Sequence, residues 1–223
     1  NCLKCIKKTC LLSLKDEYLG QWFLIIFTKL SFMNSSERND LIVSWLTISV
    51  AFAIVLTPGF FNVTSFVIAF PLSAIVVGTG FIFHELAHRQ MAKRFGAHAE
   101  YRTWRTGLII ALVSSFMGFI FAAPGAVYIY GNMNNKENGL ISIAGPATNI
   151  VIALAFFLLA FLNVNDWLSL LGALGFRINM FLALFNMLPI GPLDGKKVFI
   201  WNPIAWAITA GIAFAGVFIV PAL

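Results

Sequence analysis

The sequence has little charge for its length. Only 11% of its 223 residues are Asp, Glu, Lys or Arg, whereas 60% are hydrophobic. Soluble domains contain about 25% charged and about 45–50% apolar residues. So few charged side chains cannot cover a surface that faces water, which excludes an ordinary soluble domain and favours lipid as the solvent. The 23 Phe and 6 Trp residues are typical of a lipid-facing surface with aromatic anchors at the interfaces.

Cysteine is also scarce, and no basic patch is present. The three cysteines, Cys2, Cys5 and Cys10, lie in the first ten residues, and no histidine is near them. Three thiolates are one ligand short of a closed tetrahedral zinc site, so we interpret them as free thiols in a basic tail. The net charge of +6 forms no basic stripe with interleaved aromatic residues, which excludes nucleic acid as an expected partner.

Long apolar runs are what the sequence has in abundance. A helix crosses a bilayer with about 20 predominantly apolar residues. The runs therefore predict an all-α polytopic membrane protein with about five to six transmembrane helices, which has the lipid bilayer as its partner. No soluble domain fits between them. The runs cover residues 41–57, about 66–92, 107–123, 140–162, 167–188 and 204–220.

The first 40 residues differ from the rest. They form a basic segment whose one short apolar run, 22–27, is too short to cross a bilayer. Met33 precedes the first long apolar run and is an alternative start of the chain. A signal peptide is the other interpretation of 1–32, but no small-residue cleavage site follows the apolar run. We therefore predict a basic segment at 1–40, which includes Glu37, and an integral membrane domain at 41–223.

The positive charges predict how the runs are oriented. Arg and Lys residues follow the second run, and Lys196 and Lys197 follow the fifth, so the positive-inside rule makes both places cytoplasmic. These two groups of positive residues lie on the same side of the membrane only if the run 107–123 enters the membrane and returns. We therefore predict a re-entrant hairpin over 107–131. Within it, residues 125–131 read G-A-V-Y-I-Y-G, a glycine-bounded pattern that predicts a short β-strand.

The most informative motif is H-E-L-A-H at residues 84–88, late in the second run. Two histidines four positions apart on a helix lie on one face, so His84 and His88 can reach one zinc ion at about 2.0–2.1 Å. Glu85 is then placed to take a proton from zinc-bound water. Ionisable residues inside a membrane are costly and indicate a functional site. The alternative is that these residues are merely solvated at the cytoplasmic helix end.

A catalytic zinc ion needs a third protein ligand and an open position. Asp194 lies in an apolar setting at the inner end of the fifth run, on the same predicted side as His88. The other acidic residues lie in the N-terminal segment, in polar loops that include Glu100, or on the opposite side. The scarcity of acidic residues and their predicted sides of the membrane therefore select Asp194 as the third ligand. The remaining histidine, His98, does not match metzincin spacing, and we interpret it as an interfacial side chain.

Three segments together resemble the site-2 protease family of intramembrane zinc metalloproteases, in its compact prokaryotic form without PDZ or CBS domains. They are H-E-L-A-H at 84–88, A-G-P-A-T-N at 144–149 and N-M-L-P-I-G-P-L-D-G at 186–195. With the strand at 125–131 they define an expected catalytic core over 66–197. The resemblance implies one Zn²⁺ per chain held by the two histidines and the aspartate, with the motif glutamate as general base and then acid.

The resemblance also implies roles for residues around the metal. Asn186 is expected to hold the substrate or the developing oxyanion. Asn149 is expected to line the cavity, or alternatively to bond a neighbouring helix. The strand is expected to bind an unwound substrate segment by strand addition. The expected substrate-binding residues of the strand are Gly125, Ala126, Val127 and Tyr128.

The expected function is hydrolysis of a peptide bond within a transmembrane segment of a membrane protein. The active site is expected to open to the cytoplasm of a prokaryotic cell. A non-proteolytic zinc-binding membrane protein of the same fold is the alternative, but the intact Glu85 argues against it. A farnesylated-protein protease is disfavoured because it needs a second intramembrane glutamate. Arg177, in the middle of the fifth run, is expected to pair with an acid or to face a wet cavity.

Overall fold

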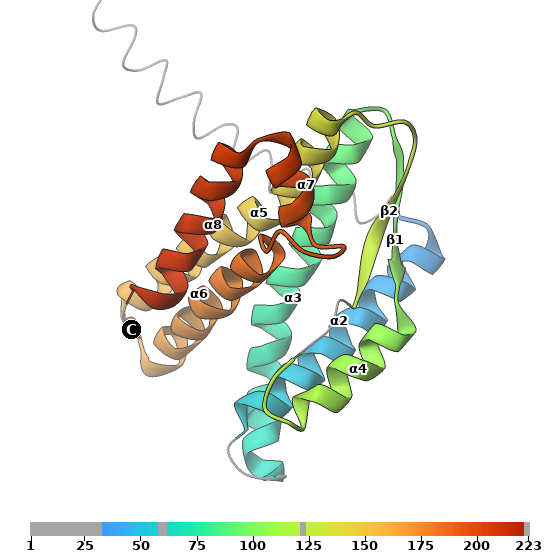
Figure 1. Ribbon diagram of the computed structural model, residues 1–223. Coiled ribbons are helices and arrows are strands. Elements are labelled where there is room, and N and C mark those ends of the chain that lie inside the picture. Colours follow the sequence, from blue (N-terminus) through green and yellow to red (C-terminus); the bar gives the residue numbers. More distant parts are fainter. Residues whose placement is uncertain (1–32, 58–61, 121–123, 221–223) are drawn as a thin grey trace, which may run out of the picture.

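A computed structural model describes residues 33–57, 62–120 and 124–220 (Figure 1). Segment 1–32, with its three cysteines, lies outside the described residues. The structure is mainly helical and contains one small β-sheet, which confirms the predicted fold class. Its helices are α2 (Ser35–Leu56), α3 (Val63–Arg94), α4 (Arg105–Ser115), α5 (Asn135–Phe161), α6 (Asp166–Asn186), α7 (Asp194–Trp201) and α8 (Pro203–Phe218).

Within the described ranges, α2, α3, α5 and α6 are long and apolar enough to cross a membrane. The predicted sixth run corresponds to α8, an apolar helix of 16 residues. α7 was not predicted. In Figure 1, α3 lies in the middle of the molecule, with α2 and α4 on one side and α5, α6 and α8 on the other. The helix that carries the H-E-L-A-H motif is therefore surrounded by other elements.

Asparagine begins most of these helices. The side chains of Asn34, Asn62, Asn134, Asn165 and Asn202 accept backbone N–H groups at the starts of α2, α3, α5, α6 and α8. An N-cap side chain satisfies a donor that has no partner within the helix. These caps explain why the helices start before the apolar runs do. α2, for example, begins six residues before residue 41, the predicted start of the first run.

The β-sheet has two antiparallel strands, β1 (His98–Thr103) and β2 (Gly125–Tyr130). β2 confirms the strand predicted at 125–131. β1 was missed, because its sequence H-A-E-Y-R-T is polar and was assigned to a loop. Pairing with β2, rather than local preference, makes it a strand.

The segment between the strands forms a hairpin. Thr103 is paired with Gly125 in the sheet, and the Trp104 N–H donates to the carbonyl of Pro124 over 3.0 Å. α4, which lies on this segment, has 11 residues and is about 16 Å long, half of a bilayer core of about 30 Å. The chain therefore leaves and re-enters the sheet at one place, as the predicted hairpin requires.

A buried ion pair joins α2 to the motif helix. Arg89, which follows His88, donates from Nε to Oε1 of Glu37 over 2.7 Å and from Nη2 to Oε2 over 3.0 Å. The Tyr101 N–H donates to the same carboxylate over 3.0 Å. Glu37 is 1% exposed, so its side chain belongs to the protein core. One carboxylate thus connects α2, α3 and β1.

Replacing Glu37 by Gln is expected to destabilise the protein strongly, because Arg89 would remain buried without its countercharge. Breaking a buried ion pair costs about 3–5 kcal/mol. Thermal unfolding of purified protein in detergent measures the effect. The matched control is Arg38→Gln, which removes an exposed charge on the same helix. Equal unfolding midpoints for the two variants would contradict a structural role for the pair.

Candidate metal centre

The H-E-L-A-H motif lies on α3 and begins at His84, ten residues before the end of the helix at Arg94. All three of its ionisable side chains are buried: His84 is 6% exposed, Glu85 9% and His88 7%. Asp194 begins α7 and contacts both histidines. The structure thus brings together the two predicted histidine ligands and the predicted carboxylate ligand, which is 106 residues away from His88.

The three donor atoms have the spacing of a metal site. His84 Nε2 and His88 Nε2 lie 3.0 Å apart, and Asp194 Oδ2 lies 3.4 Å and 3.1 Å from them. Ligands at about 2.0–2.1 Å from a tetrahedral zinc ion are separated by about 3.3–3.4 Å. Two neutral nitrogens and one carboxylate also match the donor set of catalytic zinc sites. These residues therefore fit a zinc ion.

The other nitrogen of each imidazole fixes its tautomer. His84 Nδ1 lies 2.6 Å from Oδ1 of Asn149, and His88 Nδ1 lies 2.8 Å from the carbonyl oxygen of Ile141. Both partners are acceptors, so each Nδ1 carries the proton and each Nε2 presents a lone pair to the metal position. Partners of this kind orient metal-binding histidines.

Asn149 is itself held in place by hydrogen bonds. Its Nδ2 donates to the carbonyl of Gly80 over 3.0 Å and to Oδ1 of Asn179 over 3.1 Å, which leaves Oδ1 to face His84. The side chain is fully buried. Asn149 was predicted as a substrate-binding residue or helix contact. Its contacts indicate that it orients His84 from behind.

Gly145 supplies the space that the imidazoles occupy. A Cβ atom there would collide with the ring of His88 and lie 2.7 Å from Cε1 of His84. The sequence indicates a role for Asn149 of the A-G-P-A-T-N segment but none for Gly145. The structure gives the segment a physical meaning: its glycine makes room for the ligands, and its Asn149 orients one of them.

Asp194 reaches α3 because the chain turns tightly after α6. Gly191 has a φ of +55°, which favours glycine. Gly195 lies against the backbone of Met187, whose carbonyl also accepts from Nε1 of Trp206 over 2.7 Å. Oδ2 of Asp194 faces both Nε2 atoms, so the carboxylate can bind a metal ion together with the two imidazoles.

The strand β2 lies beside Glu85. Val127 and Glu85 line the same cavity. Among the described residues β2 pairs only with β1, so its second edge has no strand partner. This edge borders a cavity of 130 Å³ that contains the metal position, which we call the polar cavity. It is lined by Gly125, Ala126, Val127, His88, Asn138, Ser142, Asp194 and Lys197, among others.

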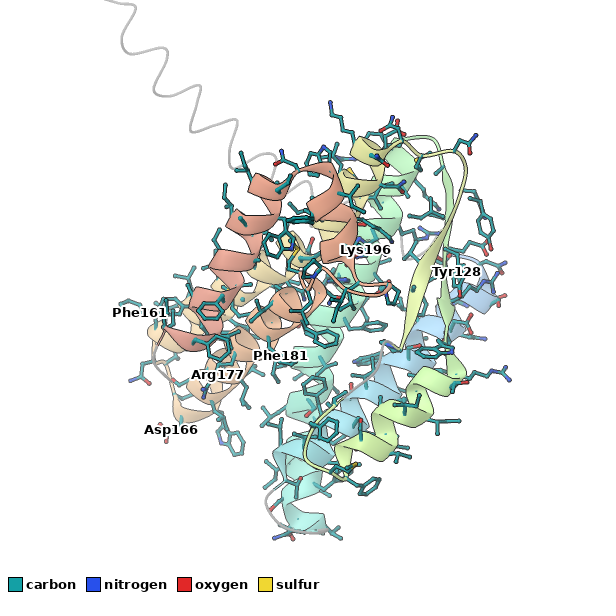
Figure 2. The ribbon with its side chains drawn as sticks, viewed as in Figure 1. Tyr128, Phe161, Asp166, Arg177, Phe181 and Lys196 are labelled. Atoms are coloured by element: carbon teal, nitrogen blue, oxygen red, sulfur yellow. The ribbon has the colours of Figure 1, made fainter. Side chains whose placement is uncertain are left out.

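The other predicted residues have distinct positions. Asn186, the last residue of α6, lines the polar cavity, and its Nδ2 donates to the carbonyl of Leu182 over 2.9 Å. The Tyr128 side chain (Figure 2) is 55% exposed and is not part of the cavity wall. Arg177 is exposed on α6 (Figure 2) and does not line the polar cavity, and its expected pairing or wet cavity stays a prediction. The catalytic and substrate-binding roles of these residues stay predictions.

Sequence comparison finds curated relatives that share a description. The chain is 45% identical over 184 residues to "Putative zinc metalloprotease MJ0611" of Methanocaldococcus jannaschii, an alignment that covers 80% of this chain and 92% of the relative. It is 31% identical to "Putative zinc metalloprotease YwhC" of Bacillus subtilis, over 57% of this chain and 67% of that protein. It is 29% identical to "Putative zinc metalloprotease Rip3" of Mycobacterium tuberculosis, over 64% of this chain and 34% of Rip3.

No family model and no solved structure matches the chain. The assignment therefore depends on the curated relatives, the motifs and the geometry of the metal centre. The MJ0611 alignment spans nearly the whole relative, and the three donor atoms converge where the motifs predict a zinc ion. The chain belongs to the site-2 protease family of zinc metalloproteases.

Proposed function

We propose that this protein is an intramembrane endopeptidase that hydrolyses a peptide bond within a transmembrane segment of another membrane protein. One observation carries the proposal: two of the three candidate ligands lie on a helix long and apolar enough to span a membrane, next to a strand edge that has no partner among the described residues. At about 1.5 Å per residue, His84 lies about 15 Å from the basic end of α3 at Arg94. This depth suits a substrate that is itself embedded in the bilayer.

The chemistry requires one metal ion and one base. Zinc bound by His84, His88 and Asp194 would polarise the scissile carbonyl and lower the pKa of a water molecule to about 7. Glu85, adjacent to the first ligand, would be the base that accepts a proton from water and then the acid that protonates the leaving amine nitrogen. The Asn186 side chain, at the wall of the same cavity, supplies an amide donor to the substrate carbonyl or the developing oxyanion.

A substrate helix must unwind before it can react. Its carbonyl groups are already hydrogen-bonded within the helix, and a polar backbone without partners is costly in a membrane. The free edge of β2 provides replacement hydrogen bonds, so the segment can bind there as an added strand. Because Val127 and Glu85 line the same cavity, a segment bound to β2 would lie beside the base.

The site is proposed to open toward the cytoplasm. Lys93 and Arg94 end α3, and Lys196 and Lys197 lie on α7, which Figure 1 shows at the same end of the molecule. Positive residues flanking apolar segments favour the cytoplasmic side. Water, a reactant, would reach the metal from that side through the polar cavity.

Cysteine labelling tests this orientation. In a variant without Cys2, Cys5 and Cys10, Asn132→Cys in the β2–α5 loop should react with a membrane-impermeant maleimide only after the cytoplasmic face is made accessible. Val164→Cys, which is 65% exposed in the α5–α6 link, is the matched control and should react from outside in intact cells. Labelling of residue 132 in intact cells would contradict the proposed orientation and the hairpin at 107–131.

Reconstituted enzyme tests the proposed reaction. Purified protein in liposomes is mixed with a reporter that has a single transmembrane helix, and the products are identified by mass spectrometry. The proposal predicts zinc-dependent cleavage inside the transmembrane segment. Cleavage confined to the loops of the reporter would contradict it and would indicate a protease acting at the membrane surface.

A further inference from the structure

A second cavity adjoins the metal centre on the side away from the basic helix ends. This apolar cavity has a volume of 110 Å³. It lies between α3, α2, α4 and α6, and Figure 2 shows Phe181 on α6. The main apolar side chains that line it are Ile48, Phe52, Phe81, Phe181, Leu182 and Phe185.

The two cavities meet at the catalytic residues. His84, Glu85, Gly125 and Asn186 line both of them. The apolar cavity extends along α3 through Phe81 and Val77, away from Arg89, whereas the polar cavity extends through His88 and reaches Lys197. A peptide bond placed at Glu85 therefore has an apolar wall on its membrane-interior side and a polar wall on its other side.

From this division we propose that the enzyme selects an aliphatic side chain next to the scissile bond on the membrane-interior side, and accepts polar residues on the other side. The inference rests on the proposed function and adds the substrate preference of the same site. The size of the apolar cavity sets the preference, since a dry cavity of about 150 Å³ holds a benzene molecule. A cavity of 110 Å³ fits a leucine or isoleucine side chain and is too small for an indole ring.

The polar cavity is different in chemistry. Asn138, Ser142 and the Lys197 ammonium are on its wall. A polar side chain can keep hydrogen bonds there, whereas beyond the shared residues at the metal centre the wall of the other cavity is mostly apolar, so a polar side chain would lose hydrogen bonds along it. Selectivity therefore acts on one side of the bond more strongly than on the other.

The experiment uses transmembrane reporters that differ only in the two residues flanking the cleaved bond, each set in turn to Leu, Ala, Trp or Asp. The full-length enzyme cleaves them in competition, and mass spectrometry counts the products. At the position on the membrane-interior side of the bond, the reporter with leucine should be cleaved about 10-fold or more faster than those with alanine, tryptophan or aspartate. At the other position, the reporter with aspartate should be cleaved at a rate within about threefold of that with leucine.

Two variants change the cavity in opposite directions. Ala111→Phe, from α4, fills it and should shift the preference from leucine toward alanine. Phe185→Ala, from α6, enlarges it and should admit tryptophan. The matched control for the first is Val113→Phe, which is 60% exposed on the same helix and lies outside the cavity wall. Each readout is a ratio of the cleavage of two substrates by one enzyme preparation. A loss of total activity therefore does not change the measured preference.

The outcomes separate the two proposals. Cleavage with the stated preference, shifted by Ala111→Phe and Phe185→Ala but not by Val113→Phe, supports the inference. Cleavage of all reporters at equal rates, or preferences that neither cavity variant changes, overturns the inference and leaves the protease function standing. Failure of the wild-type enzyme to cleave any reporter overturns both.

Discussion

Gly145→Ala is expected to abolish zinc binding while leaving the fold intact. The added methyl group would occupy the position of the His88 ring and press on Cε1 of His84 at 2.7 Å, so both ligands must move. Neither ring can move away without losing a hydrogen bond, because each is held by one at Nδ1. Zinc affinity should fall by at least the roughly 10- to 100-fold seen for lost supporting contacts of metal ligands.

Zinc content after dialysis against a metal buffer measures this loss. Gly211→Ala on α8 is the matched control, since a methyl group there would meet no atom within 4 Å. Alanine is the better helix former, so Gly211→Ala should bind zinc normally and be at least as stable as the wild type. Normal zinc binding by Gly145→Ala would show that the two histidines do not bind metal in the arrangement described.

Asn149→Ala is expected to weaken zinc binding about 10- to 100-fold. The change removes the acceptor of the His84 Nδ1–H, so the ring can rotate and its tautomer is no longer fixed. It also leaves the Gly80 carbonyl and the Asn179 side chain without their partner. A metal-buffered titration measures the affinity.

Thr148→Ala provides the comparison for Asn149→Ala. Thr148 precedes Asn149, and its hydroxyl donates only to the Ala144 carbonyl of its own helix. Its loss should leave zinc affinity unchanged. Equal affinities for both variants would mean that Asn149 is a helix contact, which was the alternative interpretation of its sequence position.

Much of the metal centre could be predicted from the sequence, because its chemistry is local. The spacing of His84 and His88 on a helix places both imidazoles on one face, whatever the tertiary structure. Asp194 was harder, since it is far away in sequence. It could still be selected because few acidic residues lie near an apolar run, and the predicted orientation of the runs excludes those on the other side of the membrane. Scarcity of charge thus made the third ligand identifiable.

Residues that depend on packing between distant segments could not be predicted. Glu37 is an ordinary polar residue in the sequence, and only the fold places Arg89 and the Tyr101 N–H around it. β1 has no local strand signal and exists through its pairing with β2. The role of Gly145 likewise requires knowing which side chains face it. A residue that acts through contacts with distant segments shows no local sequence pattern from which that role can be predicted.

The most direct test of the account compares wild-type enzyme with Glu85→Gln. Both proteins, purified in detergent, are assayed for bound zinc and for cleavage of a transmembrane reporter. Glutamine keeps the size of the side chain and replaces none of the three ligands, but it cannot take a proton from water. The account predicts about one zinc per chain in both proteins, with cleavage only by the wild type. Zinc in both and unchanged cleavage by Glu85→Gln would contradict the assignment of Glu85 as the base, and the absence of zinc from the wild type would contradict the metal centre itself.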